Sequence, residues 1–314
     1  MAAVTKFVGP LVLSPIPTER IWGVTSLEPW FPISGLEKPI GEAWLTSVEC
    51  PVASGSLQGE TLGQAAAELP DLLATPEAGG FPLLIKVLFP REKLSVQVHP
   101  NDAQALAAGK PRGQGKTECW YVLSAEPGAT VAVGFKEPLT LEQVRASITD
   151  GTLEDKLDAV PVKAGDMIFV EAGTVHAIGP GVIILETQQY SDVTYRMFDY
   201  GRPRELHLEE GLAVTRITTG AKPVAPVQVE GHTELARSAY FVVDRFDLPA
   251  DVVVSLGHAG ELQILIALED GCTLLAEDGS STTLPKAHAV VLPGEGVSYS
   301  LQGAPGAEVI RVRR

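Results

Sequence analysis

The chain has 314 residues, and its 24 Lys and Arg against 39 Asp and Glu give a formal net charge of −15, which disfavours a nucleic-acid partner. Its apolar residues are scattered, without the ~20-residue run that a membrane span needs, and the N-terminal segment does not resemble a signal peptide. Cys50, Cys119 and Cys272 are far apart and form no CxxC, so we expect a cytoplasmic protein without a disulfide framework.

Short runs rich in Val, Ile and aromatic residues, bounded by Gly, Pro or Asp, predict strands through the middle of the chain. These runs lie at 83–89, 94–99, 118–124, 130–135, 167–172 and 181–188. Helical periodicity is confined to 61–74, 140–151 and 206–217, and Thr140 and Gln143 have the spacing of a capping box. The pattern predicts an all-β fold with a few decorating helices.

A Pro-containing segment without apolar periodicity, 218–232, is the predicted linker between two domains, 1–220 and 221–314. Further short strands follow it. The segments 163–179 and 284–303 share one rhythm, in which a turn, an apolar strand, a Gly-containing turn and another strand succeed one another. This similarity predicts two related barrels, of which only the first keeps a histidine after the second turn.

Candidate metal ligands come from three segments. Gln97 and His99 are two apart in a strand-like run, so their side chains point to the same face. Glu118 starts another run, and His176 follows a turn in which Gly173 lets the chain fold back. Each residue alone also has a structural interpretation, as a hydrogen-bonded histidine or as half of a surface ion pair. Together they predict a divalent-metal site.

These segments resemble a known family. The spacing of Gly165, Glu171, Gly173 and His176 is similar to the second motif of cupin barrels, with Glu171 where proline is usual. Four segments also resemble the type I mannose-6-phosphate isomerases, in particular their short bacterial form, and occur in that family's order between about residue 10 and residue 216. They are ERIWG, LSVQVHPND, GKTECWYVL and the stretch from GTVHAIG to FDYGR.

The resemblance implies two cupin (jelly-roll) barrels and an enzyme that interconverts mannose 6-phosphate and fructose 6-phosphate through an enediolate. It implies one Zn²⁺ per chain, and it implies binding of a small sugar phosphate by a monomer or homodimer. The implied metal ligands are Gln97, His99, Glu118 and His176. The implied catalytic residues are Arg196, Lys116 and Glu186, and the implied substrate-binding residues are Ser95, Lys116 and Arg196.

Two other functions fit part of the pattern. Two histidines and one carboxylate also suit a non-haem iron cupin oxygenase, and a non-catalytic sugar-phosphate-binding bicupin needs no turnover. The extra ligand Gln97 and the cationic Arg196 and Lys116 count against the oxygenase. Arg196 could instead pair with Asp192 or Asp199. The identity of the proton-transfer group stays open between Glu186, Lys116 and a metal-bound water. In the second block, Ser298 stands at the position that matches His176, which predicts no metal site there.

Overall fold

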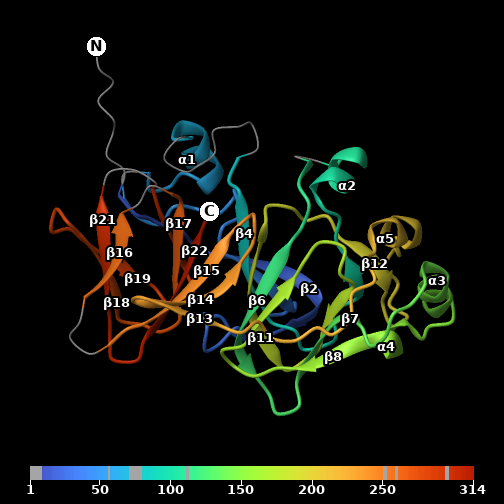
Figure 1. Cartoon of the computed structure of the whole chain (residues 1–314). Helices are drawn as coiled ribbons and strands as arrows, with labels where there is room; N and C mark the ends of the chain where they lie inside the picture. Colours follow the sequence, from blue (N-terminus) through green and yellow to red (C-terminus); the bar gives the residue numbers. More distant parts are fainter. Residues whose placement is uncertain are drawn as a thin grey trace.

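The computed structural model describes residues 9–55, 57–70, 80–110, 113–249, 253–258, 261–293 and 297–314. In this part of the chain, strands form four sheets and the helices lie outside them (Figure 1). None of the helices described is long and apolar enough to cross a membrane. The prediction of a mostly β fold with a few helices is therefore confirmed.

Two sheets make up what we call the first unit. Its six-stranded sheet has the order β2 (Ile16–Val24), β3 (Ile40–Trp44), β4 (Leu83–Leu88), β11 (Val182–Gln189), β6 (Glu118–Ala125) and β9 (Met167–Val170). Its five-stranded sheet has the order β12 (Tyr195–Phe198), β5 (Val96–Val98), β10 (His176–Ile178), β7 (Thr130–Phe135) and β8 (Leu157–Pro161). Apolar side chains from both sheets, including Trp120, Ile184 and Val131, form the core between them.

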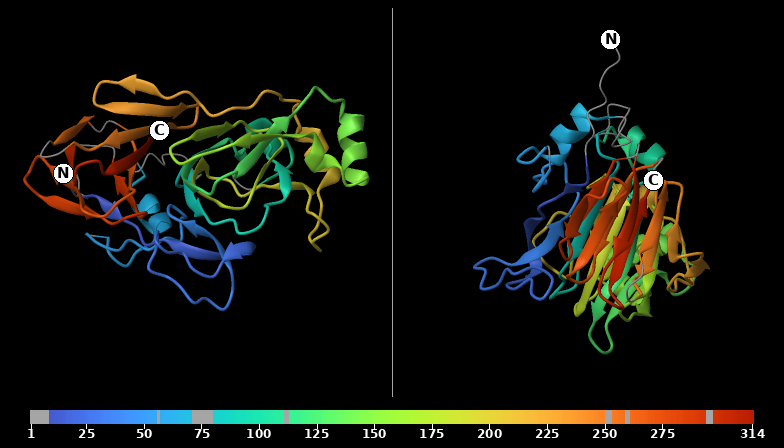
Figure 2. Two further views of the ribbon diagram at one scale, coloured as in Figure 1. Left: turned by 90° about the horizontal axis from the view of Figure 1, so that it is seen from below. Right: turned by 90° about the vertical axis from the view of Figure 1, so that its left-hand side faces the viewer.

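The other two sheets make up the second unit, which lies beside the first (Figure 2). Its seven-stranded sheet has the order β13 (Val227–Val229), β14 (His232–Arg237), β15 (Val242–Asp247), β22 (Glu308–Arg313), β17 (Gln263–Ala267), β20 (Ala289–Leu292) and β1 (Leu11–Val12). Its four-stranded sheet has the order β16 (Val254–His258), β21 (Ser298–Gln302), β18 (Cys272–Ala276) and β19 (Ser281–Leu284).

The two units share one connectivity. Apart from β1 and β12, the strand orders of the two larger sheets match position by position, and so do those of the two smaller sheets. Each strand of the first unit corresponds to the strand numbered eleven higher in the second, so that β2 corresponds to β13 and β5 to β16. The shared rhythm of the sequence has a counterpart here, because β9 to β10 and β20 to β21 each pass from the larger to the smaller sheet of their unit. Gly173 in the first of these turns has φ +88, a conformation that favours glycine.

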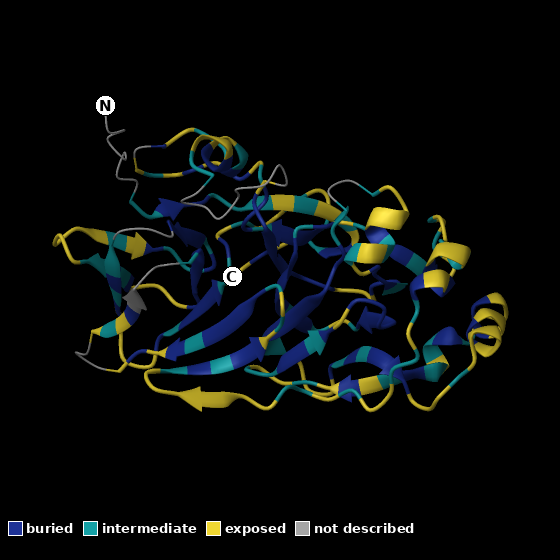
Figure 3. Cartoon of the chain, turned by 45° about the horizontal axis from the view of Figure 1, so that its top comes forward, coloured by how far each residue is buried: buried dark blue, intermediate teal, exposed yellow. Residues whose placement is uncertain are grey.

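Alternate side chains of the first unit's six-stranded sheet point into two different cores. On β4, Ile85 and Val87 belong to an apolar cluster that also contains Ile264 and Ile310 of the second unit. The alternate positions, such as Lys86 and Leu88, face the interior of the first unit. All six residues of β4 are buried, and Figure 3 shows in dark blue the buried strands at the centre of the protein.

Helices form in all three predicted patches, and two of them begin at capping boxes. Capping boxes begin α1 (Leu62–Glu68) and α3 (Leu141–Thr149), the latter from Thr140 and Gln143 as expected, and α5 (Leu208–Val214) lies in the third predicted patch. Residues 71–74 of the first patch lie outside the described residues. Two helices were not predicted, α2 (Asp102–Ala107) and α4 (Leu153–Lys156). The capping box of α2, Asn101 with Gln104, has the same spacing and could have revealed it.

The predicted linker 218–232 needs a correction, because part of it is a strand. Val227–Val229 forms β13 and pairs antiparallel with β14. Gly231, with φ +81, lies in the turn that joins the two strands. The alternating VQV run before this turn carried the strand signal that the neighbouring prolines obscured.

The three cysteines are buried free thiols.

Candidate active site

The four predicted metal ligands come together at one end of the first unit. Gln97 on β5 lies directly opposite His176, the first residue of β10, and its Nε2 is 3.2 Å from His176 Nε2. His99 follows β5, and Glu118 begins β6 in the facing sheet. The ligand atoms of His99, Glu118 and His176 all lie within 4.8 Å of one another. Strand alternation and the turn at Gly173 therefore direct these side chains to one place.

Backbone carbonyls fix the orientation of both imidazoles. His99 Nδ1 donates to the carbonyl oxygen of Val193 at 2.9 Å, and His176 Nδ1 donates to that of Thr174 at 2.8 Å. Each Nε2 lone pair is then left facing Glu118, at 3.5 Å and 3.4 Å respectively. Burial is the main cause that lowers the pKa of both histidines, to about 4 for His176. Neutral imidazoles held in this way are suited to bind a divalent metal.

Glu118 is fully buried and has polar neighbours on both carboxylate oxygens. Trp120 Nε1 donates to Oε1 at 3.1 Å, and Lys116 Nζ lies 2.6 Å from Oε2. Lys116 Nζ also lies 3.1 Å from His99 Nε2. The ion pair of Lys116 with Glu118 is thus buried at the site, and the alternative of an exposed surface pair is wrong. Burial acts to lower the pKa of Lys116, but Glu118 and Glu186 outweigh it and raise that pKa.

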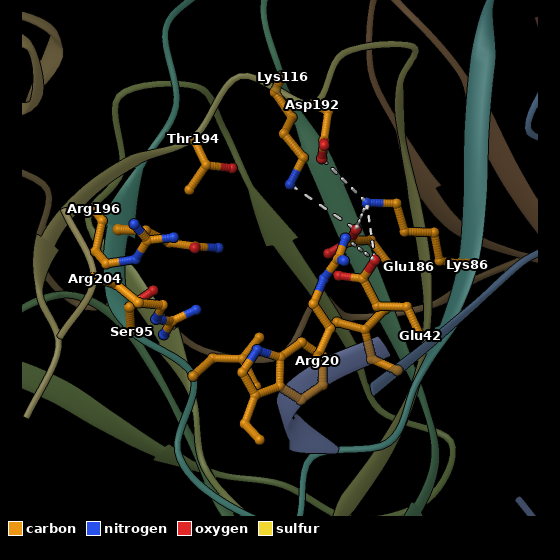
Figure 4. Close-up of a pocket in the computed structure, with 14 residues that line it drawn as sticks. Arg20, Glu42, Lys86, Ser95, Lys116, Glu186, Asp192, Thr194, Arg196 and Arg204 are labelled. Carbon is orange, nitrogen blue, oxygen red and sulfur yellow. Dashed lines mark hydrogen bonds and ion pairs between the residues drawn. The ribbon is translucent and has the colours of Figure 1, made fainter. Parts of the chain in front are cut away.

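A cavity of about 450 Å³, lined in part by Gln97 and Lys116, lies beside this site (Figure 4). Its charged lining has more cations than carboxylates, in a chain that is strongly acidic as a whole. The lining cations are Arg20, Lys86, Lys116, Arg196 and Arg204, and the lining carboxylates are Glu42, Glu186 and Asp192. Such a local excess of positive charge favours an anionic ligand.

One side of the cavity holds alternating lysines and carboxylates. Lys86 Nζ lies 3.7 Å from Glu186 Oε1, 3.8 Å from Asp192 Oδ1 and 4.0 Å from Glu42 Oε2. Glu186 Oε1 is also 4.0 Å from Lys116 Nζ. Burial raises the pKa of Glu186 more than the neighbouring lysines lower it. Glu186 is therefore a carboxylate whose charged form is disfavoured, which suits a group that exchanges a proton.

The opposite side of the cavity presents Ser95, Arg196 and Arg204 (Figure 4). Arg196 donates from Nη1 to the carbonyl oxygen of Glu205 at 2.8 Å, and its buried Nε has no hydrogen-bond partner. Asp199 instead binds Arg204 and Arg202, each at 2.7 Å. Among the described residues Arg196 forms no ion pair with Asp192 or Asp199, so its guanidinium stays available to the cavity.

All predicted site residues lie at this place, but the sequence did not reveal several others. Lys86 interrupts the apolar run LLIKVLF, and a lone charge in a buried strand was the available signal. Glu42, by contrast, is brought to the cavity by β3, and Arg20 by an irregular part of β2 where the register with β3 shifts. Glu42 Oε2 accepts hydrogen bonds from Arg20 at 2.9 Å and Trp44 at 2.6 Å.

Fold and site together define a β-sheet protein with a candidate metal centre beside a cationic cavity. The family model for the catalytic domain of type I phosphomannose isomerase matches residues 13–122. A mannose-6-phosphate isomerase of Streptococcus mutans is 35% identical over 308 residues, which cover 94% of this chain and 95% of the relative. Bacillus subtilis ManA, named a mannose-6-phosphate isomerase, is 37% identical over 76% of this chain and 79% of its own.

A solved structure agrees with these sequence relatives. The crystal structure of the mannose 6-phosphate isomerase from Bacillus subtilis superposes with a TM-score of 0.86 at 29% identity, covering 97% of this chain and 99% of that one. The chain therefore belongs to the type I phosphomannose isomerase family, as the motifs indicated.

Proposed function

We propose that the chain is a zinc-dependent aldose–ketose isomerase that interconverts mannose 6-phosphate and fructose 6-phosphate through an enediolate. The observation that carries this proposal is the convergence of Gln97, His99, Glu118 and His176 beside a cationic cavity of about 450 Å³. Membership of the phosphomannose isomerase family makes mannose 6-phosphate the first substrate to test.

The donor set fits one zinc ion. Two neutral imidazoles, one carboxylate and one amide are ligand types that Zn²⁺ accepts, and the ligand atoms of His99, Glu118 and His176 are buried within 4.8 Å of one another. Bound zinc supplies a Lewis acid for the negative charge that develops on substrate oxygen. Gln97, His99, Glu118 and His176 would hold it.

In this proposal, residues on one side of the cavity bind the phosphate and a residue on the other side transfers the proton. Ser95 and Arg196, with Arg204 beside them, bind the phosphate, because guanidinium groups match phosphate geometry. Glu186, on the opposite side, takes the proton from C2 to leave an enediolate and returns it to C1, while the hydroxyl proton moves from O2 to O1. Lys116, which contacts both Glu118 and His99, contributes positive charge next to the reacting carbons.

The second unit is a second cupin barrel without metal in this proposal, and the division into 1–220 and 221–314 is the corresponding domain boundary. Gln263, the first residue of β17, takes the place of Glu118 at the start of β6. Ser298, the first residue of β21, takes the place of His176 at the start of β10. Loss of both the carboxylate and the imidazole supports one metal ion per chain.

A coupled assay of fructose 6-phosphate formation from mannose 6-phosphate tests the function. We expect turnover by the purified protein, loss of turnover after chelation, and recovery with zinc. Oxygen uptake measured in parallel with iron-loaded protein distinguishes the iron oxygenase. Binding of the sugar phosphate without turnover by zinc-loaded protein would contradict the isomerase and leave a binding protein.

A further inference from the structure

Lys116 lies in a segment without regular secondary structure, directly before β6. Three consecutive backbone N–H groups of this segment nevertheless have partners. Gly115 N–H donates to Asp102 Oδ1 at 2.7 Å, and Lys116 N–H donates to the carbonyl oxygen of Pro100 at 3.0 Å. Thr117 N–H donates to Gln189 Oε1 at 2.9 Å. Two of the three acceptors are side chains, so the course of this segment depends on those side chains.

The two acceptor side chains are joined to each other. Gln189 Nε2 donates to Asp102 Oδ1 at 2.8 Å, so one amide side chain bridges Thr117 and Asp102. We call Asp102 and Gln189 the bridge. Asp102 lies three residues after His99, and Gln189 lies three residues after Glu186. The bridge therefore connects the segments that carry His99, Lys116 and Glu186.

The protein packs closely around Gln189 and Thr117. Gln189 and Thr117 are 5% and 4% exposed. A Cβ on Gly115 would lie 2.5 Å from the carbonyl carbon of Asn101, so the close approach of the segment to the start of α2 requires glycine here. Gln189 is buried and hydrogen-bonded through both its amide oxygen and its amide nitrogen, and this restricts where the Lys116 side chain can reach.

The second unit also reaches the bridge. Tyr240, which precedes β15, lies near Asp102, and both burial and that carboxylate raise the pKa of Tyr240. Tyr240 and Arg314 line a cavity of about 90 Å³ together with Asp102 and Gln189. Contact between the two units thus extends to the side chains that hold the Lys116 segment.

We propose that Asp102 and Gln189 are positioning residues that fix Lys116 in its working geometry. The role of Lys116 in turnover rests on the function proposed above. The support of the segment by the bridge does not depend on that function.

Four variants test the proposal. Gln189→Ala removes the hydrogen bonds of Gln189 with Thr117 N–H and with Asp102, whereas Gln189→Glu keeps an acceptor for Thr117 N–H but repels Asp102. The double variant Asp102→Asn with Gln189→Glu restores a donor and an acceptor between the two positions. Gln104→Ala is the matched control, because it breaks the neighbouring capping box of α2 and leaves the bridge intact.

For Gln189→Ala we expect kcat to fall about 10- to 100-fold, since small displacements of a reacting group cost this much. KM and zinc bound per chain should stay within twofold of wild type. Hydrogen–deuterium exchange at the amides of 115–117 should accelerate in Gln189→Ala and Gln189→Glu, return toward wild type in the double variant, and stay unchanged in Gln104→Ala.

Unchanged exchange at 115–117 in Gln189→Ala would overturn the bridge, and so would an equal loss of kcat in Gln104→Ala. Accelerated exchange with wild-type kcat would overturn the positioning role. If the wild-type protein fails to isomerise mannose 6-phosphate, the proposed function fails, while the exchange experiment still decides whether the bridge holds the segment.

Discussion

Lys86 and Glu186 face each other directly across β4 and β11, with 3.7 Å between Nζ and Oε1. Both side chains are buried, and both point into the cavity of the first unit. The register of two central strands therefore sets the distance between a cation and the carboxylate that we assign to proton transfer. The precision of the site depends in this way on rigid strands rather than on loops.

Glu186→Gln should lower kcat by about 10²- to 10⁴-fold, because an amide cannot take up the proton that a general base removes. Zinc content should be unchanged, since Glu186 is not among the proposed ligands. The coupled assay and metal analysis on the same preparation measure both. Glu171→Gln, which removes an exposed carboxylate paired with Arg216, is the control and should keep full activity. Wild-type kcat in Glu186→Gln would rule out this assignment.

His176→Ala should weaken zinc binding by at least about 10- to 100-fold, the loss typical of removing even an outer-shell partner. Competition with a chromophoric chelator gives the affinity directly and does not require turnover. His288→Ala in the second unit, where His288 packs against Phe31, should bind zinc as wild type does. Equal zinc affinity of the two variants would contradict the assigned ligand set.

Arg196→Ala should raise KM for mannose 6-phosphate about 10- to 100-fold, since a hydrogen bond to a charged group contributes ~1.5–3 kcal/mol. Inorganic phosphate should inhibit the variant correspondingly less. Initial rates at varied substrate and phosphate provide both constants. Arg145→Ala, which breaks an exposed pair with Glu209, serves as the comparison and should leave KM unchanged. A loss confined to kcat would place Arg196 away from the phosphate.

Glu42 predicts a pH dependence of stability. Burial acts to raise the pKa of Glu42, but Lys86, Arg20 and the hydrogen bond from Trp44 together hold it below its ordinary value. The charged carboxylate therefore stabilises the fold above the unfolded-state pKa, and this contribution is lost as pH falls through the lower folded-state pKa.

Urea unfolding at several pH values tests this dependence. Glu42→Gln should be less stable than wild type by about 1–3 kcal/mol at pH 7, with the difference shrinking as pH falls below about 4. Glu19→Gln, at an exposed pair with Lys38, is the control. A difference that stays constant down to pH 3 would show that the charge of Glu42 contributes nothing.

Local patterns in the sequence predicted the parts of the fold that depend on neighbouring residues. Thr140 with Gln143 began a helix, and the apolar runs at 118–124 and 181–188 became β6 and β11. The strands β2 and β12 were missed, because register shifts interrupt both of them and their apolar alternation is weak.

In the candidate site, too, the residues predicted were those that local patterns indicate. Gln97, His99 and His176 were identifiable from strand alternation and a glycine turn. Glu42 was not, because it reaches the cavity only through the pairing of β3 with β4. Pairing between strands far apart in sequence depends on the whole sheet, and a single segment carries no record of its partner.

The pairing of β1 with β20 makes the two halves of the chain interdependent during folding. Leu11 and Val12 pair with Val291 and Val290, so β1 completes the edge of the sheet that also contains β22. A fragment that begins at residue 221 would expose the backbone of β20 as an open edge, available to pair with other chains. The two halves of the chain are therefore expected to aggregate when they are produced apart.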